Sequence, residues 1–337
     1  MSTITEPPPS PIPLFTTVKA YREWRRRAYD ERKSVGFVPT MGALHEGHMS
    51  LVRRSLAEND LTVLSIFVNP AQFAPHEDLA TYPRTLPKDI ELLMAESFND
   101  TNTSTTRQAS GIFLPTANEM YPSGISQDVN EQKGTFIEVK GYGHQMEGVS
   151  RPTFFRGVAT VVTKLFNAIE PTNAYFGQKD IQQALLLKRM VRDLLLSHPD
   201  PEHVHIVPTA RNPTTGLALS SRNAYLTTDG HKVAPTLIQA LQAAEQAWGE
   251  GLTKAECVQK ATEVVDATKR RAQAEGLNAE MKLDYIQLND SQTFEIIEPQ
   301  SSKADISHPV ILSGALWIDK TRLIDNIILG DINTVIG

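Results

Sequence analysis

The chain has 337 residues, of which 40% are hydrophobic and 21% charged, an ordinary globular composition with enough length for two domains. Its net charge of −6 argues against a nucleic-acid-binding surface, and its single cysteine, Cys257, excludes an intrachain disulfide. No apolar run approaches membrane-spanning length, and the N-terminus lacks the apolar core of a signal peptide. We therefore expect a cytoplasmic protein with no membrane or nucleic-acid partner.

The first two thirds of the chain alternate between strand-like and helix-like segments. Strands are predicted at 34–39, 61–68, 111–115, 173–177 and 203–209, and helices from about 46, at 86–97, at 155–170 and from 180. In "FRGVATVVTKLFNAIEP" six apolar residues fall on one helical face before Pro171 ends the helix. This alternation predicts an α/β fold with a Rossmann-like, doubly wound parallel sheet.

The pattern changes after about Pro208. Two long helices, at about 231–248 and 253–274, precede strands at 283–290, 308–319 and 321–329. Helices followed by strands predict a smaller α+β domain. We therefore expect a disordered proline-rich tail over 1–13, a Rossmann-like domain over 14–208 with a mobile polar insertion at about 98–111, and a C-terminal domain over 209–337.

Two histidines stand where the first predicted strand turns into a helix, in "PTMGALHEGH". His45 and His48 are three residues apart near a helix start, so they share a face and can point at one ligand. Gly42 and Gly47 leave room for a phosphate, and exposed amides at a helix N-terminus favour anions. The spacing differs from the i, i+4 histidines of zinc proteases, and no third ligand cluster accompanies it. Taken alone, the motif could also be an ordinary polar turn.

Polar side chains also follow three other predicted elements. Asn69 and Gln72 in "VNPAQF" offer neutral amides to a small polar acid, although Asn-Pro alone could fix a turn there. "SSRN" at 220–223 offers hydroxyl and guanidinium donors suited to phosphate oxygens, or forms an ordinary turn. Because ligands of such sheets bind at the carboxyl ends of the strands, we expect these segments to converge on one cleft.

The segment "GQKD" at 177–180 contains a charge that needs explanation. Asp180 is a favoured residue at a helix N-cap, so its presence could be purely structural. Lys179 is different, because the helix macrodipole disfavours a cation at that end. A bound polyphosphate would remove the conflict. No Walker-type loop and no G-x-G-x-x-G fingerprint is present.

Six of these stretches, in order, resemble the pantoate–β-alanine ligase family. They are "PTMGALHEGHMSLV", "FVNPAQF", "YPRT", "RPTFFRGVATVVTKLFN", "FGQKDIQQ" and "GLALSSRNAYL", and the similarity continues through "TRLIDN". "HEGH" and "SSRN" also look like the two signature motifs of the wider adenylate-forming nucleotidyltransferase superfamily. The resemblance covers about residues 35–329.

The resemblance implies a two-step reaction. The carboxylate of pantoate would attack the α-phosphate of Mg²⁺-bound ATP, giving pantoyl adenylate and pyrophosphate. The amine of β-alanine would then attack the activated carbonyl and release AMP and pantothenate. The fold would be a Rossmann-like domain with a C-terminal lid, paired as a homodimer, with no organic cofactor.

The resemblance also assigns site residues by position. His48 would be the proton donor, His45 would contact the phosphates, and Lys179 would complete the catalytic set. Gln72 and Gln183 match pantoate-binding glutamines, to which Asn69 is added from its place at a strand end. The ATP-binding residues would be Met41, Gly42, Ala43, Leu44, His45, Glu46, Gly47, His48, Gly177, Gln178, Lys179, Asp180, Ala210, Leu219, Ser220, Ser221 and Arg222.

The chain departs from the family pattern at three positions. Phe154 replaces the histidine of "RPxHF", and Gln178 replaces a glutamate that bacterial relatives carry. Asp89 matches a magnesium position, but Lys88 stands where some relatives have a second acid.

Two other functions are compatible with a site of this kind. The chain could adenylate a different acid, or it could bind a nucleotide without catalysis. The glutamine pair Gln72 and Gln183 argues against the first. The intact set of histidines, lysine, serines and arginine argues against the second.

Overall fold

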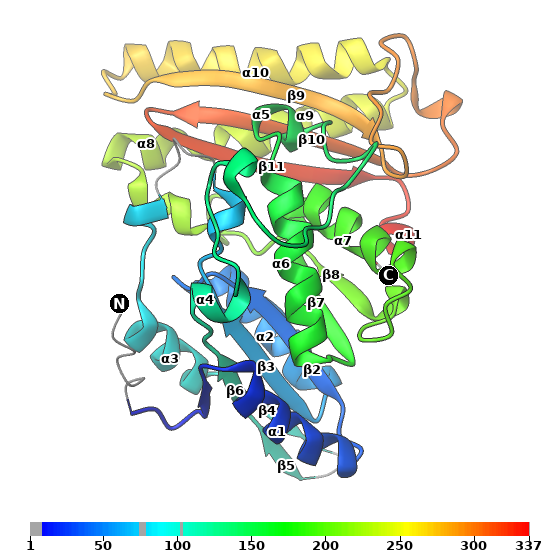
Figure 1. Cartoon of the computed structure of the whole chain (residues 1–337). Coiled ribbons are helices and arrows are strands. Elements are labelled where there is room, and N and C mark those ends of the chain that lie inside the picture. Colours follow the sequence, from blue (N-terminus) through cyan, green and yellow to red (C-terminus); the bar gives the residue numbers. More distant parts are fainter. Residues whose placement is uncertain (1–8, 74–78, 102–103, 337) are drawn as a thin grey trace. The chain divides into compact units, whose positions relative to one another are not determined.

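The computed structural model describes residues 9–73, 79–101 and 104–336. The chain divides into two compact units (Figure 1). Unit 1 comprises Met1–Gly177 and Gln182–Val207, and unit 2 comprises Gln178–Ile181 and Pro208–Gly337. Residues 178–181 therefore belong with the C-terminal unit, although they were expected in the first domain. Each unit is described by itself.

Unit 1 is built on a six-stranded sheet in the order β1-β6-β3-β2-β7-β8, in which every neighbouring pair is parallel. The predicted doubly wound sheet is confirmed. Its order is not that of the chain, because β3 and β6 extend the sheet on one side of β2, and β7 and β8 then extend it on the other side. The strands are β1 (Leu14–Phe15), β2 (Val35–Thr40), β3 (Leu61–Ile66), β6 (Ala109–Phe113), β7 (Asn173–Gly177) and β8 (Val204–Val207).

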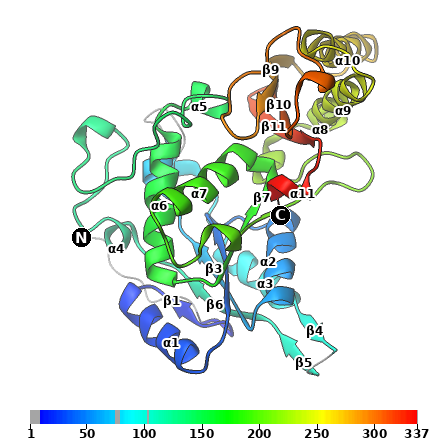
Figure 2. The same ribbon diagram turned by 90° about the vertical axis from the view of Figure 1, so that its right-hand side faces the viewer.

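Helices cover both faces of this sheet (Figure 2). On one face Val38, Leu64 and Ile112 pack with apolar residues of α2 and α3. On the other, the ring of Phe166 in α6 lies 6.4 Å from that of Phe37. The helices are α1 (Val18–Asp30), α2 (Glu46–Glu58), α3 (Leu86–Ala95), α4 (Ala117–Met120), α5 (Glu147–Ser150), α6 (Phe154–Ile169) and α7 (Ile181–Asp193), with short 3₁₀ turns η1 (Pro70–Gln72), η2 (Leu79–Thr81), η3 (Val129–Glu131) and η5 (Pro201–His203).

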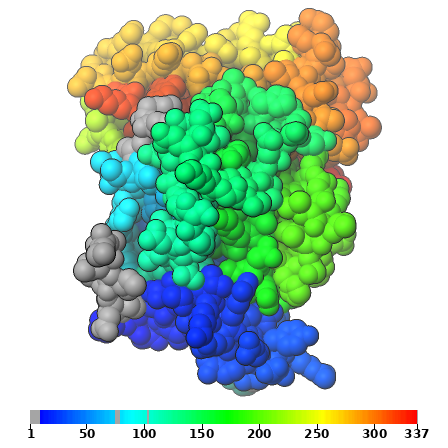
Figure 3. All heavy atoms as spheres, viewed as in Figure 1, coloured from blue at the N-terminus to red at the C-terminus, as the bar shows by residue number. Residues whose placement is uncertain are grey.

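The stretch between α4 and α6 covers the outer face of unit 1 in the view of Figure 3. It is attached to α6 by polar contacts. The Ile137 amide donates to Thr160 Oγ1 (2.9 Å), and the Lys164 ammonium donates to the Met120 carbonyl (2.7 Å). The Arg156 guanidinium lies 4.1 Å from the centre of the Phe136 ring. A long irregular segment is thus fixed against a helix that borders the candidate site.

The polar stretch expected as a mobile insertion contains a hairpin, β4 (Phe98–Asp100) with β5 (Thr105–Arg107); residues 102–103 lie outside the described part of the chain. The contacts of Arg107 explain why this hairpin is ordered. Its guanidinium pairs with Asp100 (2.6 Å) and donates to the carbonyls of Leu56, Ala57 and Asn59 at the end of α2. Cations are favoured at a helix C-terminus, so the hairpin closes that end of α2.

The expectation for the N-terminal tail is wrong in part. Residues 1–8 of the predicted disordered tail lie outside the described residues, but Ile12 is buried and the Pro13 carbonyl accepts a bond from the Ile112 amide (2.9 Å). The arginine-rich segment forms α1, yet Arg25 is only 5% exposed. Its Nε and Nη2 donate to the carbonyl of Glu170, at the C-terminal end of α6. Arg25 thus binds the C-terminal end of α6, where a cation is favoured.

Unit 2 is a three-stranded antiparallel sheet, ordered β11-β10-β9, with α9 and α10 packed against it. Its helix–sheet core includes Cys257, which is fully buried. The single helix expected at 231–248 is interrupted at Ala234–Pro235, since proline has no amide to continue the ladder. The elements are η4 (Gln178–Asp180), η6 (Ser221–Tyr225), α8 (Thr228–Val233), α9 (Thr236–Gly249), α10 (Lys254–Ala274), β9 (Met281–Asp290), η7 (Lys303–Asp305), β10 (Val310–Ile318), β11 (Thr321–Leu329) and α11 (Asn333–Ile336).

In the part of the chain described, no helix combines the length and apolar character needed to cross a membrane.

Candidate active site

The loop between β2 and α2 adopts left-handed backbone at two successive residues. Gly42 has φ +84° and Ala43 has φ +50°. Glycine adopts this conformation freely, whereas alanine does so at an energetic cost. The amides of Ala43 and Leu44 donate to the Asp89 carboxylate, at 3.1 and 2.8 Å. The turn is thus closed around an acidic side chain of α3.

His45 and His48 form the N-terminal cap of α2. The Gly47 amide donates to His45 Nδ1 (3.0 Å), and the His45 amide donates to His48 Nδ1 (3.4 Å). The ring centres lie 4.2 Å apart, so the predicted shared face is confirmed. A backbone amide can only donate, so each Nδ1 accepts, and a neutral imidazole with an accepting Nδ1 carries its proton on Nε2. Two of the amides expected to face a phosphate are therefore used by the histidines.

Glu46, which follows His45 in this cap, forms an ion pair with Arg53. Arg53 also binds Glu96 at the end of α3, at 2.7 Å. More than half of the Glu46 side chain is exposed. Its contacts in unit 1 are thus those of a surface ion-pair network.

Gln72 and Met41 are brought together at the ends of β3 and β2. Gln72 Nε2 lies 3.2 Å from Met41 Sδ. Asn69 is 1% exposed, and its Nδ2 donates to Gln72 Oε1 (3.1 Å) and to the Gly157 carbonyl (3.2 Å). Its Oδ1 accepts from the Tyr121 hydroxyl at 2.7 Å. These bonds occupy both amide hydrogens of Asn69, so this residue orients Gln72.

The Tyr121 hydroxyl is the donor in its hydrogen bond with Asn69. Burial raises the pKa of its hydroxyl well above the usual range, so the proton stays on the oxygen. The Lys164 ammonium lies 4.0 Å from the centre of the Tyr121 ring, and burial lowers the pKa of that lysine. Neither residue was singled out from the sequence. Only their contacts with Asn69 and with each other identify them as part of the site.

Phe154, at one of the departures from the family pattern, stacks on Arg151. The guanidinium lies 3.9 Å from the ring centre, and Arg151 Nη2 donates to the Gln72 carbonyl (2.9 Å). Close packing of α6 fixes the same turn, because a Cβ on Gly157 would lie 2.1 Å from the Ala71 carbonyl oxygen. The phenylalanine thus supports an arginine that holds the main chain of Gln72.

In unit 2, the turn η4 is bound to β11 through Asn326. Its Nδ2 donates to the carbonyls of Gln178 (2.9 Å) and Lys179 (3.0 Å), and its Oδ1 accepts from Gln178 Nε2 (3.2 Å). Gln178 and Asn326 are both buried. Asp180 lies 3.7 Å from Lys179 Nζ. The bonds to Asn326 explain why 178–181 belong to unit 2.

The loop that precedes "SSRN" is bound to β11 through Asp325, the residue before Asn326. Arg211 makes a two-pronged ion pair with Asp325, at 2.6 and 2.9 Å, and donates to the Gly216 carbonyl (3.2 Å). The Leu219 amide donates to the Ala210 carbonyl (2.9 Å). The loop is therefore closed on itself as well as attached to β11.

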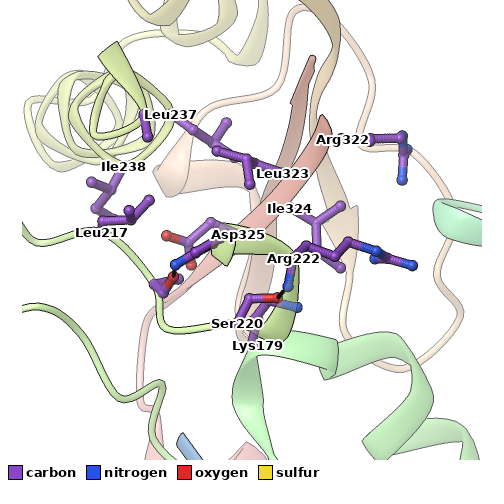
Figure 4. A pocket seen from close by; sticks show the side chains of 13 residues that line it. Lys179, Leu217, Ser220, Arg222, Leu237, Ile238, Arg322, Leu323, Ile324 and Asp325 are labelled. Atoms are coloured by element: carbon purple, nitrogen blue, oxygen red, sulfur yellow. Dashed lines mark hydrogen bonds between the residues drawn. The ribbon is translucent and has the colours of Figure 1, made fainter. Parts of the chain in front are cut away.

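A pocket in unit 2 unites the lysine of η4 with the "SSRN" residues (Figure 4). Ser220 caps η6, its Oγ accepting from the Arg222 amide (3.3 Å). In Figure 4 Lys179, Ser220 and Arg222 lie at one end, and apolar side chains lie at the other. Such a pocket offers both a cationic and an apolar wall to a ligand. It is lined by Lys179, Leu217, Ala218, Ser220, Arg222, Asn223, Ala234, Leu237, Ile238, Arg322, Leu323, Ile324 and Asp325.

The predicted residues thus form one group in each unit. Unit 1 holds the histidine loop, Gln72 and Gln183. Gln183 is half-buried and lies in the first turn of α7. Its neighbour Gln182 is buried and donates to the carbonyls of Tyr142 and Gln145. Unit 2 holds η4 and the "SSRN" loop. The sequence analysis did not select Asp325 and Asn326 as site residues. Two adjacent polar residues in the apolar strand "TRLIDNIIL" could have indicated them.

No cluster of three or more histidine, cysteine, aspartate or glutamate side chains suited to a metal ion occurs among the described residues. The Asp89 carboxylate in particular is buried and already accepts three hydrogen bonds, from Ala43, Leu44 and Thr85. The expected magnesium contact therefore does not fit this residue as the structure places it.

The chain is similar over nearly its whole length to proteins of one enzyme family. The family model described as pantoate-beta-alanine ligase matches residues 13–328. The pantoate–β-alanine ligase of Saccharomyces cerevisiae is 42% identical over 335 residues, covering 94% of this chain and 99% of the relative.

Solved structures show the same similarity. Pantothenate synthetase from Thermus thermophilus is 37% identical with a TM-score of 0.73, covering 94% of this chain and 99% of that one. The Francisella tularensis pantoate-beta-alanine ligase, complexed with "Beta-gamma ATP" and β-alanine, is 31% identical with a TM-score of 0.67, covering 94% and 97%.

Proposed function

This chain belongs to the pantoate–β-alanine ligase family, and we propose how its own residues carry the reaction of that family. The chain is an ATP-dependent ligase that condenses pantoate with β-alanine to pantothenate. In the first step the pantoate carboxylate attacks the α-phosphorus of ATP and pyrophosphate leaves. In the second, the β-alanine amine attacks the carbonyl of pantoyl adenylate and AMP leaves.

We propose that the histidines act on the phosphates in the first step. Negative charge shifts onto phosphate oxygens as the bond to pyrophosphate breaks, and fixed donors at those oxygens lower the barrier. His45 and His48 supply Nε2–H donors, because backbone amides occupy their Nδ1 atoms. Lys179 and Arg222 add positive charge, and Ser220 and Ser221 add hydroxyl donors.

We propose that Gln72 and Gln183 bind pantoate. Gln72 accepts from Asn69 through its side-chain oxygen and from Arg151 through its carbonyl, so its carboxamide has a set direction. Its amide nitrogen then donates to the acid. With both substrates aligned, the reaction needs no protein nucleophile. Cys257 is unsuited to that role, because burial raises the pKa of its thiol to about 11.

The observation that carries this assignment is the double histidine cap of α2. It gives a physical reason for two imidazoles at one turn: each stabilises the helix start through Nδ1 and is thereby set as an Nε2–H donor. An ordinary polar turn would need only one capping side chain. A regulatory nucleotide-binding protein would not need both donors fixed in this way.

Three further properties are proposed from the family alone. ATP would react as its Mg²⁺ complex, the cation neutralising phosphate charge; the chain would pair as a homodimer; and it would work in the cytoplasm. We assign no protein ligand to the magnesium ion.

Pantoate-dependent exchange of labelled pyrophosphate into ATP tests the proposal. We expect exchange with pantoate in the absence of β-alanine, because adenylation is a complete half-reaction. Adding β-alanine should divert the adenylate to AMP and pantothenate in equal amounts. Both products should be followed, so that each half-reaction is measured separately.

Two outcomes would contradict the proposal. Exchange supported by another hydroxy acid but not by pantoate would indicate a ligase of different specificity. Measurable ATP binding without exchange for any acid would indicate a protein that binds nucleotide without catalysis.

A further inference from the structure

Asp89 is a buried carboxylate that accepts three hydrogen bonds from the chain itself. It lies in the first turn of α3 and is 1% exposed. Oδ1 accepts from the Leu44 amide (2.8 Å) and from Thr85 Oγ1 (3.0 Å), and Oδ2 accepts from the Ala43 amide (3.1 Å). A carboxylate bound by several fixed donors is a strong local constraint on the groups that donate to it.

The amides of Ala43 and Leu44 form the kind of concave donor pair that binds anions in phosphate-binding loops. Successive residues in unusual backbone conformations point their N–H groups inward to make such a site. Here the anion inside is Asp89. Gly42 fits this arrangement too, since a Cβ there would lie 3.2 Å from Asp89 Oδ2 and 3.1 Å from Ile66 Cγ2. The glycine therefore makes room for the aspartate.

A magnesium ion does not fit the same carboxylate. Mg²⁺ is held at about 2.0–2.1 Å in an octahedron that retains several waters. Three of the roughly four acceptor positions of the Asp89 carboxylate are already taken, and the buried position has little space for those waters. The adjacent side chain, exposed Lys88, is a cation that opposes a metal there.

We propose that Asp89 is a positioning residue for the two histidines. It holds Ala43 and Leu44 in the conformation from which the chain enters α2, and Leu44 is joined directly to His45. The Nε2–H donors of His45 and His48 therefore depend on a carboxylate that acts on them through the backbone of Ala43 and Leu44. This inference rests on the proposed function only for its effect on turnover; its effect on the imidazoles is independent of any substrate.

Asp89→Asn is the sharpest test, because asparagine has nearly the same side-chain shape as aspartate. It replaces one accepting oxygen by an NH₂ group, a donor that would face an amide or a hydroxyl. The first measurement is the ¹⁵N spectrum of histidine-labelled protein without metal or nucleotide. We expect wild type to show the Nε2–H tautomer at His45 and His48, and the variant to shift those resonances. The signals are assigned with His45→Gln and His48→Gln. Unchanged resonances in a folded variant would overturn the proposal.

The second measurement separates positioning from metal binding in the full enzyme. We expect kcat of Asp89→Asn to fall about 10- to 100-fold, as for a small misplacement of catalytic groups. The concentration of free Mg²⁺ giving half-maximal rate should stay within about twofold of wild type. A shift of tenfold or more in that concentration, with unaltered histidine resonances, would identify Asp89 as a metal ligand.

Two variants serve as matched controls. Lys88→Ala, in the same helical turn, should leave the histidine spectrum and turnover unchanged. Thr85→Ala removes one of the three donors and should shift the same resonances in the same direction by a smaller amount. Asp89→Asn could instead show the histidine spectrum of wild type and, after correction for its unfolded fraction, the wild-type rate. Asp89 would then have only a structural role, and the proposal would be wrong.

Discussion

Two buried aspartates hold the two groups of candidate site residues, and they do so through different partners. In unit 1, Asp89 binds two neutral backbone amides of a left-handed turn. In unit 2, Asp325 binds the guanidinium of Arg211 through two bonds, and its side chain is 3% exposed. The first carboxylate sets a backbone shape, whereas the second neutralises a charge that links a loop to a strand.

The difference predicts different consequences when each aspartate is lost. Peptide amides left without Asp89 can turn towards water, so the loop changes shape at modest energetic cost. Arg211 left without Asp325 retains a partly buried charge with no carboxylate to balance it, which is costly. We therefore expect the unit 1 aspartate to matter mainly for turnover, and the unit 2 aspartate mainly for stability.

The largest effect should come from removing a histidine of the unit 1 cap. His48→Ala should lower the rate of pantoate-dependent pyrophosphate exchange by about two to three orders of magnitude, as for the loss of one preorganised donor. Loss of the cap should also lower the free energy of unfolding by about 1 kcal/mol. Exchange kinetics and urea unfolding measure the two effects separately. A fully active variant would remove His48 from the mechanism.

The ion pair of unit 2 should give the next largest effect. Asp325→Asn should lower the free energy of unfolding by about 2–3 kcal/mol, less than for a fully buried pair because 27% of the Arg211 side chain is exposed. Urea unfolding can be followed through Trp248 and Trp317 of unit 2 in a Trp24→Phe background. As a control, the double variant Arg211→Met with Asp325→Leu should recover part of the loss. If Asp325→Asn were as stable as wild type, the proposed contrast between the two aspartates would fail.

A smaller and more selective effect is expected at Gln72. Gln72→Ala should lower kcat/KM for pantoate by about 10- to 100-fold, since it removes a hydrogen bond to a charged substrate. The dissociation constant of ATP, measured by calorimetry, should be unaffected. Phe154→His is the matched control: it alters only the ring stacked on Arg151, so we expect a change of about threefold or less. Equal weakening of ATP binding in Gln72→Ala would argue against a role in the acid site.

The smallest effect should be at Cys257. With its thiol buried in unit 2 and its pKa raised to about 11, the residue is protonated throughout the neutral range. Cys257→Ser should therefore leave kcat and KM unchanged, with some loss of stability from a hydroxyl in an apolar core. Inactivation of the native enzyme by a thiol reagent, under conditions where its tryptophan fluorescence is unchanged, would contradict this.

The sequence alone was sufficient for features that depend on neighbours along the chain. Alternating apolar strands and helices predicted the parallel sheet, and the spacing of His45 and His48 predicted that they share a face. These features follow from the period of a helix or strand, which needs no knowledge of distant residues. The hairpin at 98–107 was not predicted, because it is held in place by hydrogen bonds from Arg107 to the end of α2.

Only the tertiary structure decided which residues support the site. Asp89 is 46 residues from Ala43, and Asp325 is 114 residues from Arg211. Neither distance has a signature in the sequence, because the partner of a buried charge is chosen by which segments the fold brings together. The sequence alone therefore did not show that Asp89 bonds to the backbone of the histidine loop, or that Asn69 bonds to the side chain of Gln72.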